Sequence, residues 1–389
     1  MDVPIRAWAE KHGTPFYLLD VERARSELSR LRDAFQLVYA QTRLAYSVKT
    51  NYLPPLILAA HQDGHLIEVV SRHEWEHVRA LGVSDVEVIF NGPVKSVADL
   101  QEAHRAGVSF NVDSMAELQT VAELSDELGL PVPAGLRISP RLPNGRQSRF
   151  GLHPDDVAAT VPGLLRDGRI TVRGLHLHYS MDRSAESYRG RVDLLSMVAD
   201  RLGVAPRYID IGGGLASDLP PSVREQLGYH VSTFDEYASA AGGAMRDRWG
   251  AGGPTLILEP GTATLSGAMS YVTSVVSTRP DEGTVVVDGT MFETNPLQSK
   301  VHPPIRRLAG SGQRTTRSTV YGATCMEIDV LGELREPVDP GDVLVVENVG
   351  AYSVVLAPQF IVSRAGVLDA ASGEVVRQPA KVGDLGGPW

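Results

Sequence analysis

The sequence has little of several features that define common protein classes. Its one cysteine, Cys325, excludes an intramolecular disulfide framework and fits a reducing compartment. No stretch of 18 uncharged apolar residues occurs, and the charged amino terminus does not have the pattern of a signal peptide. The net charge of −10 and the scarcity of lysine and arginine runs argue against a nucleic-acid surface. We therefore expect a cytoplasmic protein with neither membrane nor nucleic-acid partners.

Signatures of metal and nucleotide binding are also missing. There is no CxxC or HxxEH-type spacing, and the eleven histidines form no ligand cluster apart from the pair His176 and His178. The triple glycine Gly212, Gly213, Gly214 lacks the Gly-Lys-Ser/Thr of a P-loop and the spaced glycines of a dinucleotide fingerprint. We predict no metal. A phosphate that is not part of a nucleotide is the better expectation for the glycines.

What the chain does contain, between residues 40 and 260, is a series of short apolar runs separated by helical patterns. One such pattern, 114–128, opens with Ser114 as a helix cap and Glu117 three residues later. The apolar runs are 44–48, 66–70, 86–90, 108–112, 134–139, 172–178, 208–211 and 255–259. Eight strands alternating with helices favour a closed parallel (β/α)8 barrel over the alternative, an open doubly wound sheet.

The chain of 389 residues is too long for one ordinary core. After about residue 265 its runs become rich in Val and Thr and are separated by Gly, Pro and Asp turns, which predicts an antiparallel β domain. We place the barrel at 22–265, the β domain at 266–375 and a tail at 376–389.

A polar residue or a glycine follows each of the predicted barrel strands. These positions are Lys49, the 71–74 region, Asn91, Asp113, Arg137, His178, Gly212–Gly214 and Glu259. The carboxyl ends of barrel strands form the face on which active sites are built. The sequence therefore predicts an active site on this rim.

Three of these groups suit a phosphorylated pyridine aldehyde. The Lys49 amine can attack an aldehyde, the glycine N–H groups can bind a phosphate, and the Glu259 carboxylate can keep a pyridine nitrogen protonated. Each also has a plain structural reading: a solvated charge, a flexible turn, and a salt bridge from Glu259 to Arg137. His178 is either a core histidine or a ring that stacks on a cofactor.

Ten short motifs together make the chain resemble a known family. AYSVKTN, EVVSRHE, LRIS, SRFGL, GLHLH, DIGGG, LEPG, VVVDG, GATC and GAYS occur in the order found in the fold-type III pyridoxal-phosphate (PLP) decarboxylases, which act on ornithine, arginine and diaminopimelate. The resemblance spans about 14–365. It implies PLP as cofactor, a strand from residues 1–21 in the β domain, and a homodimer with shared active sites.

The resemblance also implies roles for individual residues. Lys49 would hold PLP as a Schiff base, with Glu68 behind it and Glu74 as the later acid of the same motif. Cys325 would cross from the partner subunit to protonate the substrate α-carbon. The other implied cofactor residues are Arg137, His178, Ser180, Gly212, Gly213, Gly214, Glu259 and Tyr352. The implied substrate residues are Asp288, Met326, Glu327 and Phe360.

The sequence departs from the family pattern at three places. Thr262 replaces an arginine after LEPG, and Tyr179-Ser180-Met181 replaces a Gly-Ser phosphate contact. Met326 replaces the acid after the cysteine, with Glu327 one residue later. Since a buried cationic side chain needs a carboxylate, we expect an amino acid with a neutral, acylated or modified side chain, either free or carrier-bound. The alternatives are a decarboxylase of ornithine, lysine or diaminopimelate, and a PLP-dependent racemase.

Overall fold

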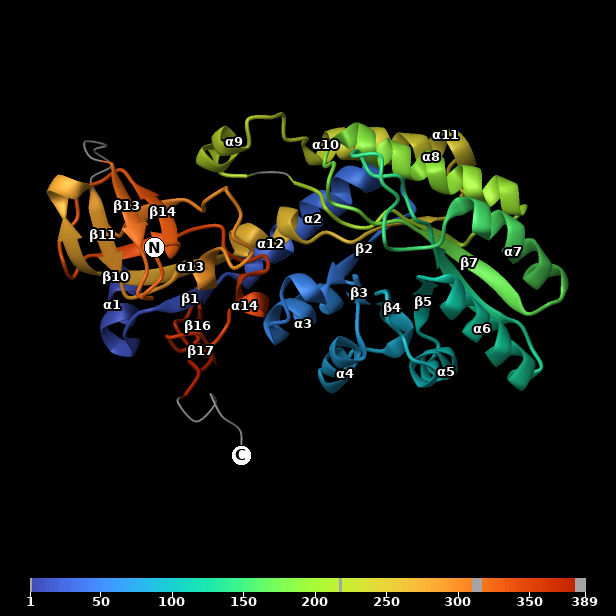
Figure 1. Ribbon diagram of the computed structural model, residues 1–389, viewed down its shortest axis with the longest axis horizontal. Helices are drawn as coiled ribbons and strands as arrows, with labels where there is room; N and C mark the ends of the chain where they lie inside the picture. Colours follow the sequence, from blue (N-terminus) through green and yellow to red (C-terminus); the bar gives the residue numbers. More distant parts are fainter. Residues whose placement is uncertain (1, 217–218, 310–316, 382–389) are drawn as a thin grey trace. The chain divides into compact units, whose positions relative to one another are not determined.

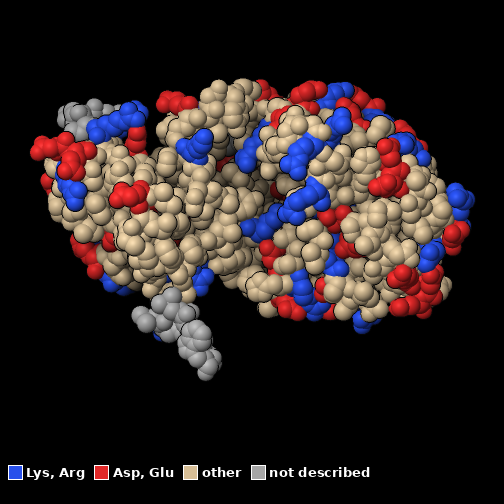
Figure 2. All heavy atoms as spheres, viewed as in Figure 1, with Lys and Arg blue, Asp and Glu red and all other residues tan. Residues whose placement is uncertain are grey.

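The computed structural model describes residues 2–216, 219–309 and 317–381, and the chain divides into two compact units (Figure 1). The barrel unit comprises Arg25–Asp218 and His230–Thr264; the β unit comprises Met1–Ala24, Leu219–Tyr229 and Leu265–Trp389. Among the described residues, no helix is both long and apolar enough to cross a membrane. On the face of the barrel unit shown in Figure 2, acidic and basic side chains are interspersed, so this face carries no single sign of charge.

Eight parallel strands close into a barrel, which confirms the predicted architecture and rules out an open sheet. They are β2 Thr42–Ser47, β3 Leu66–Val69, β4 Val88–Phe90, β5 Ser109–Val112, β6 Val132–Arg137, β7 Ile170–His176, β8 Tyr208–Asp210 and β9 Thr255–Leu258. Each overlaps one predicted run. The register of β9 on β2, with Leu256 opposite Thr42, completes the closure.

The interior of the barrel is filled around the ring of Tyr208. Apolar neighbours of this ring are Ala45, Leu66, Ile89 and Ile257. A Cβ atom at Gly174 would lie 2.2 Å from the Tyr208 ring, and one at Gly135 would lie 2.2 Å from its hydroxyl, so both positions require glycine. The hydroxyl donates a 2.7 Å hydrogen bond to Oδ1 of Asn111. The one polar end of the ring is thereby satisfied inside the core.

Helices cover the outside of the barrel (Figure 1). They are α2 Val21–Val38, α3 Pro54–Gln62, α4 Arg72–Ala80, α5 Val97–Ala106, α6 Met115–Leu128, α7 Pro154–Arg166, α8 Ala185–Leu202, α10 Phe234–Tyr237, α11 Gly243–Trp249 and α12 Thr262–Leu265. Helix α6 confirms the segment predicted at 114–128, because the Ser114 side chain accepts the N–H of Glu117 at 3.2 Å. The Glu117 side chain does not complete a capping box with Ser114 but accepts the N–H of Asp113.

The β unit is a nine-stranded sheet with short helices. Its strands are β1 Phe16–Leu19, β10 Met269–Arg279, β11 Thr284–Val287, β12 Ile305–Arg307, β13 Ser318–Tyr321, β14 Val330–Leu334, β15 Val343–Val346, β16 Gly366–Asp369 and β17 Val375–Arg377. Its helices are α1 Asp2–His12, α9 Pro221–Leu227, α13 Met291–Thr294 and α14 Ser353–Leu356. One apolar cluster joins Ile5 of α1 to Phe16 and Leu18 of β1 and to Val272 of β10. Strand β1 thus supplies part of the core, as the resemblance implied for the amino terminus.

The expectation of an antiparallel β domain needs a correction, because the sheet is mixed. Strand β1 pairs in parallel with β16, and β11 pairs in parallel with β13. The turn residues predict only antiparallel neighbours, since a short turn cannot join parallel strands. Parallel pairing between strands far apart in the chain leaves no such local signal. Of the predicted tail, Arg377 still belongs to β17 and residues 382–389 lie outside the described part of the chain.

Candidate active site

Lys49 lies just beyond the carboxyl end of β2, in a single turn of 3-10 helix at Val48–Thr50. Its Nζ atom is 2.5 Å from Oε2 of Glu68 and donates to Oγ of Ser47 at 2.7 Å. The register of β2 on β3, with Ser47 opposite Glu68, brings these groups together. The Glu68 side chain is 1% exposed and that of Lys49 is 28% exposed. A buried acid therefore holds an accessible amine at the rim of the barrel.

Asn91, which follows β4, connects this pair to Glu259. Its Nδ2 group donates to Oε1 of Glu259 at 2.5 Å and to Oε1 of Glu68 at 3.3 Å. Its Oδ1 atom accepts from Asn111, which in turn accepts from Tyr208. A buried chain of hydrogen bonds thus runs from the barrel core to both carboxylates. From the sequence Asn91 was only a polar residue after a strand.

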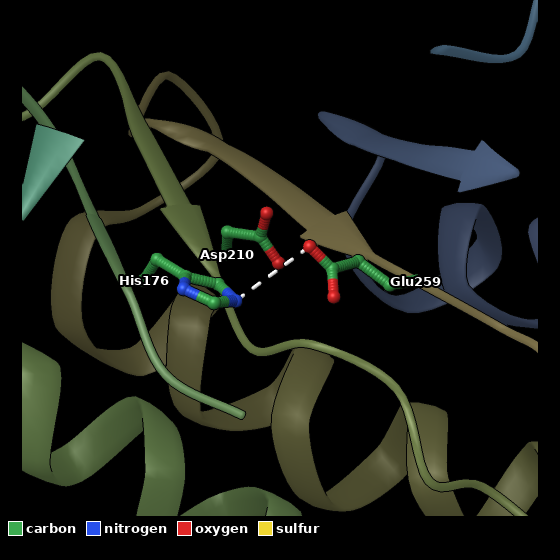
Figure 3. A group of neighbouring side chains, drawn as sticks. All are labelled: His176, Asp210 and Glu259. Carbon is green, nitrogen blue, oxygen red and sulfur yellow. Dashed lines mark ion pairs between the residues drawn. The ribbon is translucent and has the colours of Figure 1, made fainter. Parts of the chain in front are cut away.

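Glu259 belongs to a buried group with His176 and Asp210, which point toward one another (Figure 3). Nε2 of His176 is 3.6 Å from Oε1 of Glu259, and one ligand atom from each of the three residues lies within 4.8 Å of the others. Among the described residues, neither ring nitrogen of His176 has a hydrogen-bond partner, and Oδ2 of Asp210 has none either. In the sequence Asp210 is only the residue before the last apolar position of its run, and His176 stands out only by its spacing to His178.

Two acids side by side in a buried space do not share the same charge state. Burial, reinforced by Glu259, raises the pKa of Asp210 well above its ordinary value. Burial alone would raise the pKa of Glu259 too, but His176 and Lys49 outweigh it and bring that pKa below its ordinary value. Burial lowers the pKa of His176. Glu259 is therefore the charged member of the group.

By donor type, His176, Asp210 and Glu259 could also hold a metal ion. Two of their oxygens already accept hydrogen bonds within the protein: Oδ1 of Asp210 from the N–H of Gly212, and Oε1 of Glu259 from Asn91. The absence of a metal remains a prediction. Oε1 of Glu259 also faces Nε2 of His176, and the carboxylate has a second oxygen, Oε2, that suits a donor such as a protonated ring nitrogen.

The glycine loop after β8 uses two of its three N–H groups internally. Gly212 donates to Asp210 and Gly213 donates to Nδ1 of His178, both at 2.9 Å. The N–H groups of Gly214 and Leu215 have no partner among the described residues. Of the three glycines for which we predict phosphate binding, Gly214 is therefore the one whose N–H is not engaged by a described residue; phosphate binding itself stays a prediction. The fold demands glycine here, because a Cβ at Gly213 would lie 2.2 Å from the carbonyl oxygen of Glu259.

His178 is half-buried beside this loop. Because its Nδ1 accepts the Gly213 N–H, a neutral ring carries its proton on Nε2. Burial lowers the pKa of His178 well below its ordinary value, and Lys49 and Arg191 add to this shift. A neutral, flat ring suits stacking on an aromatic cofactor. The backbone of Ser180 packs on the same loop, with its Cα 3.4 Å from where a Cβ at Gly214 would lie.

Arg137, at the end of β6, pairs with Asp113 at 2.6 Å and lies over the ring of Phe150 at 4.7 Å. The salt bridge between Glu259 and Arg137 that the sequence left open is therefore not the arrangement found. A second buried pair, Lys95 and Glu117 at 3.0 Å, lies on the neighbouring rim segments. No motif in the sequence marks Lys95.

Three predicted residues of the β unit lie on the turn between β13 and β14. Cys325, Met326 and Glu327 are all exposed there. Asp329 anchors the turn, since its carboxylate accepts from Thr290 and from both the N–H and the hydroxyl of Thr324. The turn thus presents a thiol and a carboxylate outward.

The other three residues predicted for substrate or cofactor binding in the β unit are Asp288, Phe360 and Tyr352. Both carboxylate oxygens of Asp288 already accept hydrogen bonds, from Thr14, Thr273 and Ser274. Phe360 is largely exposed and meets Phe292 edge to face. Tyr352 adopts a left-handed backbone with φ of 65° at the start of α14.

Comparison with known proteins agrees with this geometry. The family model described as "Pyridoxal-dependent decarboxylase, pyridoxal binding domain" matches residues 25–266. Because this is more than half of the chain, the protein belongs to the family of PLP-dependent decarboxylases. The resemblance inferred from the sequence is confirmed, as is PLP as the cofactor.

Individual relatives cover almost the whole chain. The protein y4yA of Sinorhizobium fredii, described as uncharacterized, is 29% identical over 97% of this chain and 93% of its own. The diaminopimelate decarboxylase of Methanothermobacter thermautotrophicus is 27% identical over 90% of this chain and 85% of its own. The solved structure of diaminopimelate decarboxylase from Helicobacter pylori, complexed with L-lysine, has a TM-score of 0.85 at 21% identity and covers 98% of both chains. This last similarity shows a shared fold.

Proposed function

We propose that this protein removes the α-carboxylate from a diamino acid, with diaminopimelate as the first candidate. The observation that carries the proposal is the contact of Lys49 with buried Glu68, joined through Asn91 to the charged carboxylate of Glu259. This arrangement presents an amine for an aldehyde and a carboxylate for a ring nitrogen on one rim of the barrel. The chain also belongs to a family whose members decarboxylate amino acids.

In this proposal each rim residue has a distinct task. Lys49 would hold the cofactor covalently through its amine. PLP, when bound, supplies a protonated ring that accepts the electron pair left as CO2 departs. Oε2 of Glu259 holds the proton on the ring nitrogen, and the neutral ring of His178 stacks against the cofactor. The N–H groups of Gly214 and Leu215, which no described residue engages, would bind the phosphate together with Ser180, and Arg137 would lie beside the cofactor. Tyr352 keeps the phosphate role predicted from the sequence.

The proton that replaces CO2 on the α-carbon comes, in this proposal, from the thiol of Cys325 in the partner subunit. The thiol is exposed on a turn that Asp329 anchors, so it is presented outward. A homodimer with shared sites is part of the same proposal.

We choose the substrate class from the named relatives, and not from Met326, which on its own favours a neutral or acylated side chain. A relative covering 90% of this chain is a diaminopimelate decarboxylase, which favours a substrate with a distal ammonium over a neutral or acylated one. Met326 offers no charge, and the oxygens of Asp288 are engaged within the β unit. Glu327 is exposed and makes no ion pair with a described residue. We therefore propose that the carboxylate of Glu327 binds the distal ammonium group of the substrate.

The test is a panel of carboxyl-labelled amino acids incubated with the PLP-loaded protein, with labelled CO2 as the readout. The panel contains diaminopimelate stereoisomers, lysine, ornithine, arginine and their side-chain acetylated forms. We expect the highest kcat/KM for diaminopimelate and no turnover with Lys49→Ala. Turnover of acetylated forms alone would overturn the substrate class. Loss of optical activity without CO2 release would point to a racemase instead.

A further inference from the structure

Arg191, in the middle of α8, is a buried cation without an acidic partner. Its exposed fraction is 1%, and it forms no ion pair with a described residue. Its Nη1 donates to the carbonyl oxygens of Ile211 and Gly213 at 2.8 Å, and its Nη2 donates to that of Tyr179 at 2.8 Å. Its Nε has no hydrogen-bond partner in the described part of the chain. Because an unpaired buried charge is strongly destabilising, the position of Arg191 calls for a compensating negative group.

Two tyrosine rings and the carbonyl oxygens compensate the charge in part. The guanidinium lies 3.8 Å from the ring centre of Tyr188 and 4.6 Å from that of Tyr179. The hydroxyl of Tyr188 donates to the same Gly213 oxygen at 2.7 Å. Two donors from α8 thus converge on one carbonyl of the glycine loop.

These donors fix the direction of the peptide between Gly213 and Gly214. In a trans peptide the C=O and the N–H point in opposite directions. Since the Gly213 oxygen points at Arg191 and Tyr188, the Gly214 N–H points away from them. That N–H has no partner among the described residues. A positive charge at the oxygen end also polarises the peptide and makes its N–H a stronger donor.

We propose that Arg191 is the positioning residue for the phosphate of PLP, and that it acts through the Gly213–Gly214 peptide rather than by contact. The inference rests on PLP binding at Lys49 as proposed above. The phosphate dianion is the negative group that compensates the buried guanidinium from the far side of the loop. The segment after Glu259 offers no cation for this purpose, because Thr262 is uncharged.

The test compares PLP with pyridoxal, which has the same aldehyde and ring but no phosphate. Affinities of the apoprotein for both are measured for the wild type, Arg191→Gln, Arg191→Lys and the control Arg189→Gln. Arg189 is on the same helix, 44% exposed, and faces Asp193. The phosphorus resonance of bound PLP is recorded in each variant as a second readout.

We expect Arg191→Gln to weaken PLP binding about tenfold to a hundredfold, the range for hydrogen bonds to charged groups. Pyridoxal binding should change by less than about threefold, so the ratio of the affinities for PLP and pyridoxal should fall sharply. Arg191→Lys keeps the charge but loses the forked contacts, so its affinity for PLP should lie between those of the wild type and Arg191→Gln. If Arg191→Gln does not fold, the Arg191→Lys measurement provides the test. Arg189→Gln should match the wild type, and the phosphorus resonance should shift only in the Arg191 variants.

Equal losses for PLP and pyridoxal would show that Arg191 only braces the loop, and this would overturn the inference. Unchanged affinities in both Arg191 variants would overturn it as well. Failure of the proposed function looks different: the wild-type protein itself would then fail to bind PLP at Lys49. The wild-type measurement therefore separates the two outcomes.

Discussion

Nε2 of His176 lies 3.6 Å from Oε1 of Glu259, and Asp210 completes this buried group. The register of β7 on β8 sets His176 opposite Asp210, and Glu259 follows the last residue of β9. The site thus contains two neighbouring acids of which one, Glu259, is charged and the other, Asp210, is neutral. The two acids should therefore respond differently to replacement by their neutral amides.

We predict that Glu259→Gln lowers kcat at least about a hundredfold while PLP still binds, since an electrostatic group aimed at the reacting system contributes on that scale. Asp210→Asn should stay within about threefold of the wild type, because the amide replaces a neutral acid and its oxygen can still accept the Gly212 N–H. Labelled CO2 release measures both. Near-normal turnover by Glu259→Gln, with Asp210→Asn inactive, would reverse the assignment of charges.

The barrel could be predicted because its strands are short, mainly apolar and buried runs, such as Val88–Phe90, with a polar residue close behind, here Asn91. The local cap at Ser114 was predicted for a similar reason, since it depends on residues three apart. The mixed pairing of the β unit could not be predicted. Strand β1 meets β16 across nearly the whole length of the chain, and no turn joins them.

Site residues that directly follow a strand could be predicted from the sequence. Site residues that lie within a strand or on a helix could not. Lys49 and Glu259 follow strands. His176 and Asp210 are the last residues of β7 and β8, and they meet only when those strands pair. Arg191 lies on α8, where its charge suggests a solvated helix face, and its burial appears only once the glycine loop is placed against it. Polar residues at the ends of adjacent strands were the one available signal.

Glu74 gives the protein a pH-dependent stability. Burial raises the pKa of its carboxyl from 4.5 to about 7, with Glu68 adding to the shift and Lys49 opposing it. The folded state therefore binds this proton more tightly than the unfolded state. Its stabilising contribution is complete below about pH 4.5 and is lost as the pH rises through about 7.

We predict that Glu74→Gln becomes progressively more stable than the wild type from pH 5 to pH 8, by at most about 1.4 kcal/mol per pH unit. The glutamine oxygen can still accept the N–H of Val70, as the carboxylate does at 2.7 Å. Urea unfolding across this range measures the difference. Glu76→Gln, at a more exposed position of the same helix, is the control. A constant difference between wild type and Glu74→Gln would show that Glu74 does not titrate in this window.

A shared active site makes inactive subunits complement each other. Lys49→Ala and Cys325→Ala should each be nearly inactive, but after mixing one site of every heterodimer contains both wild-type residues. Random pairing of equal amounts gives about one quarter of wild-type activity, because half of the dimers are mixed and each has one intact site. Heterodimers that are shown to form yet remain inactive would contradict a site shared between subunits.

The most direct test of the central claim is borohydride reduction of the PLP-loaded protein, followed by peptide mapping. The sequence contains five lysines, Lys11, Lys49, Lys95, Lys300 and Lys381, so each is readily distinguished. We predict the reduced adduct on Lys49 alone, and loss of both the adduct and CO2 release in Lys49→Ala. An adduct on another lysine, such as the buried Lys95, or full activity without Lys49, would contradict the account.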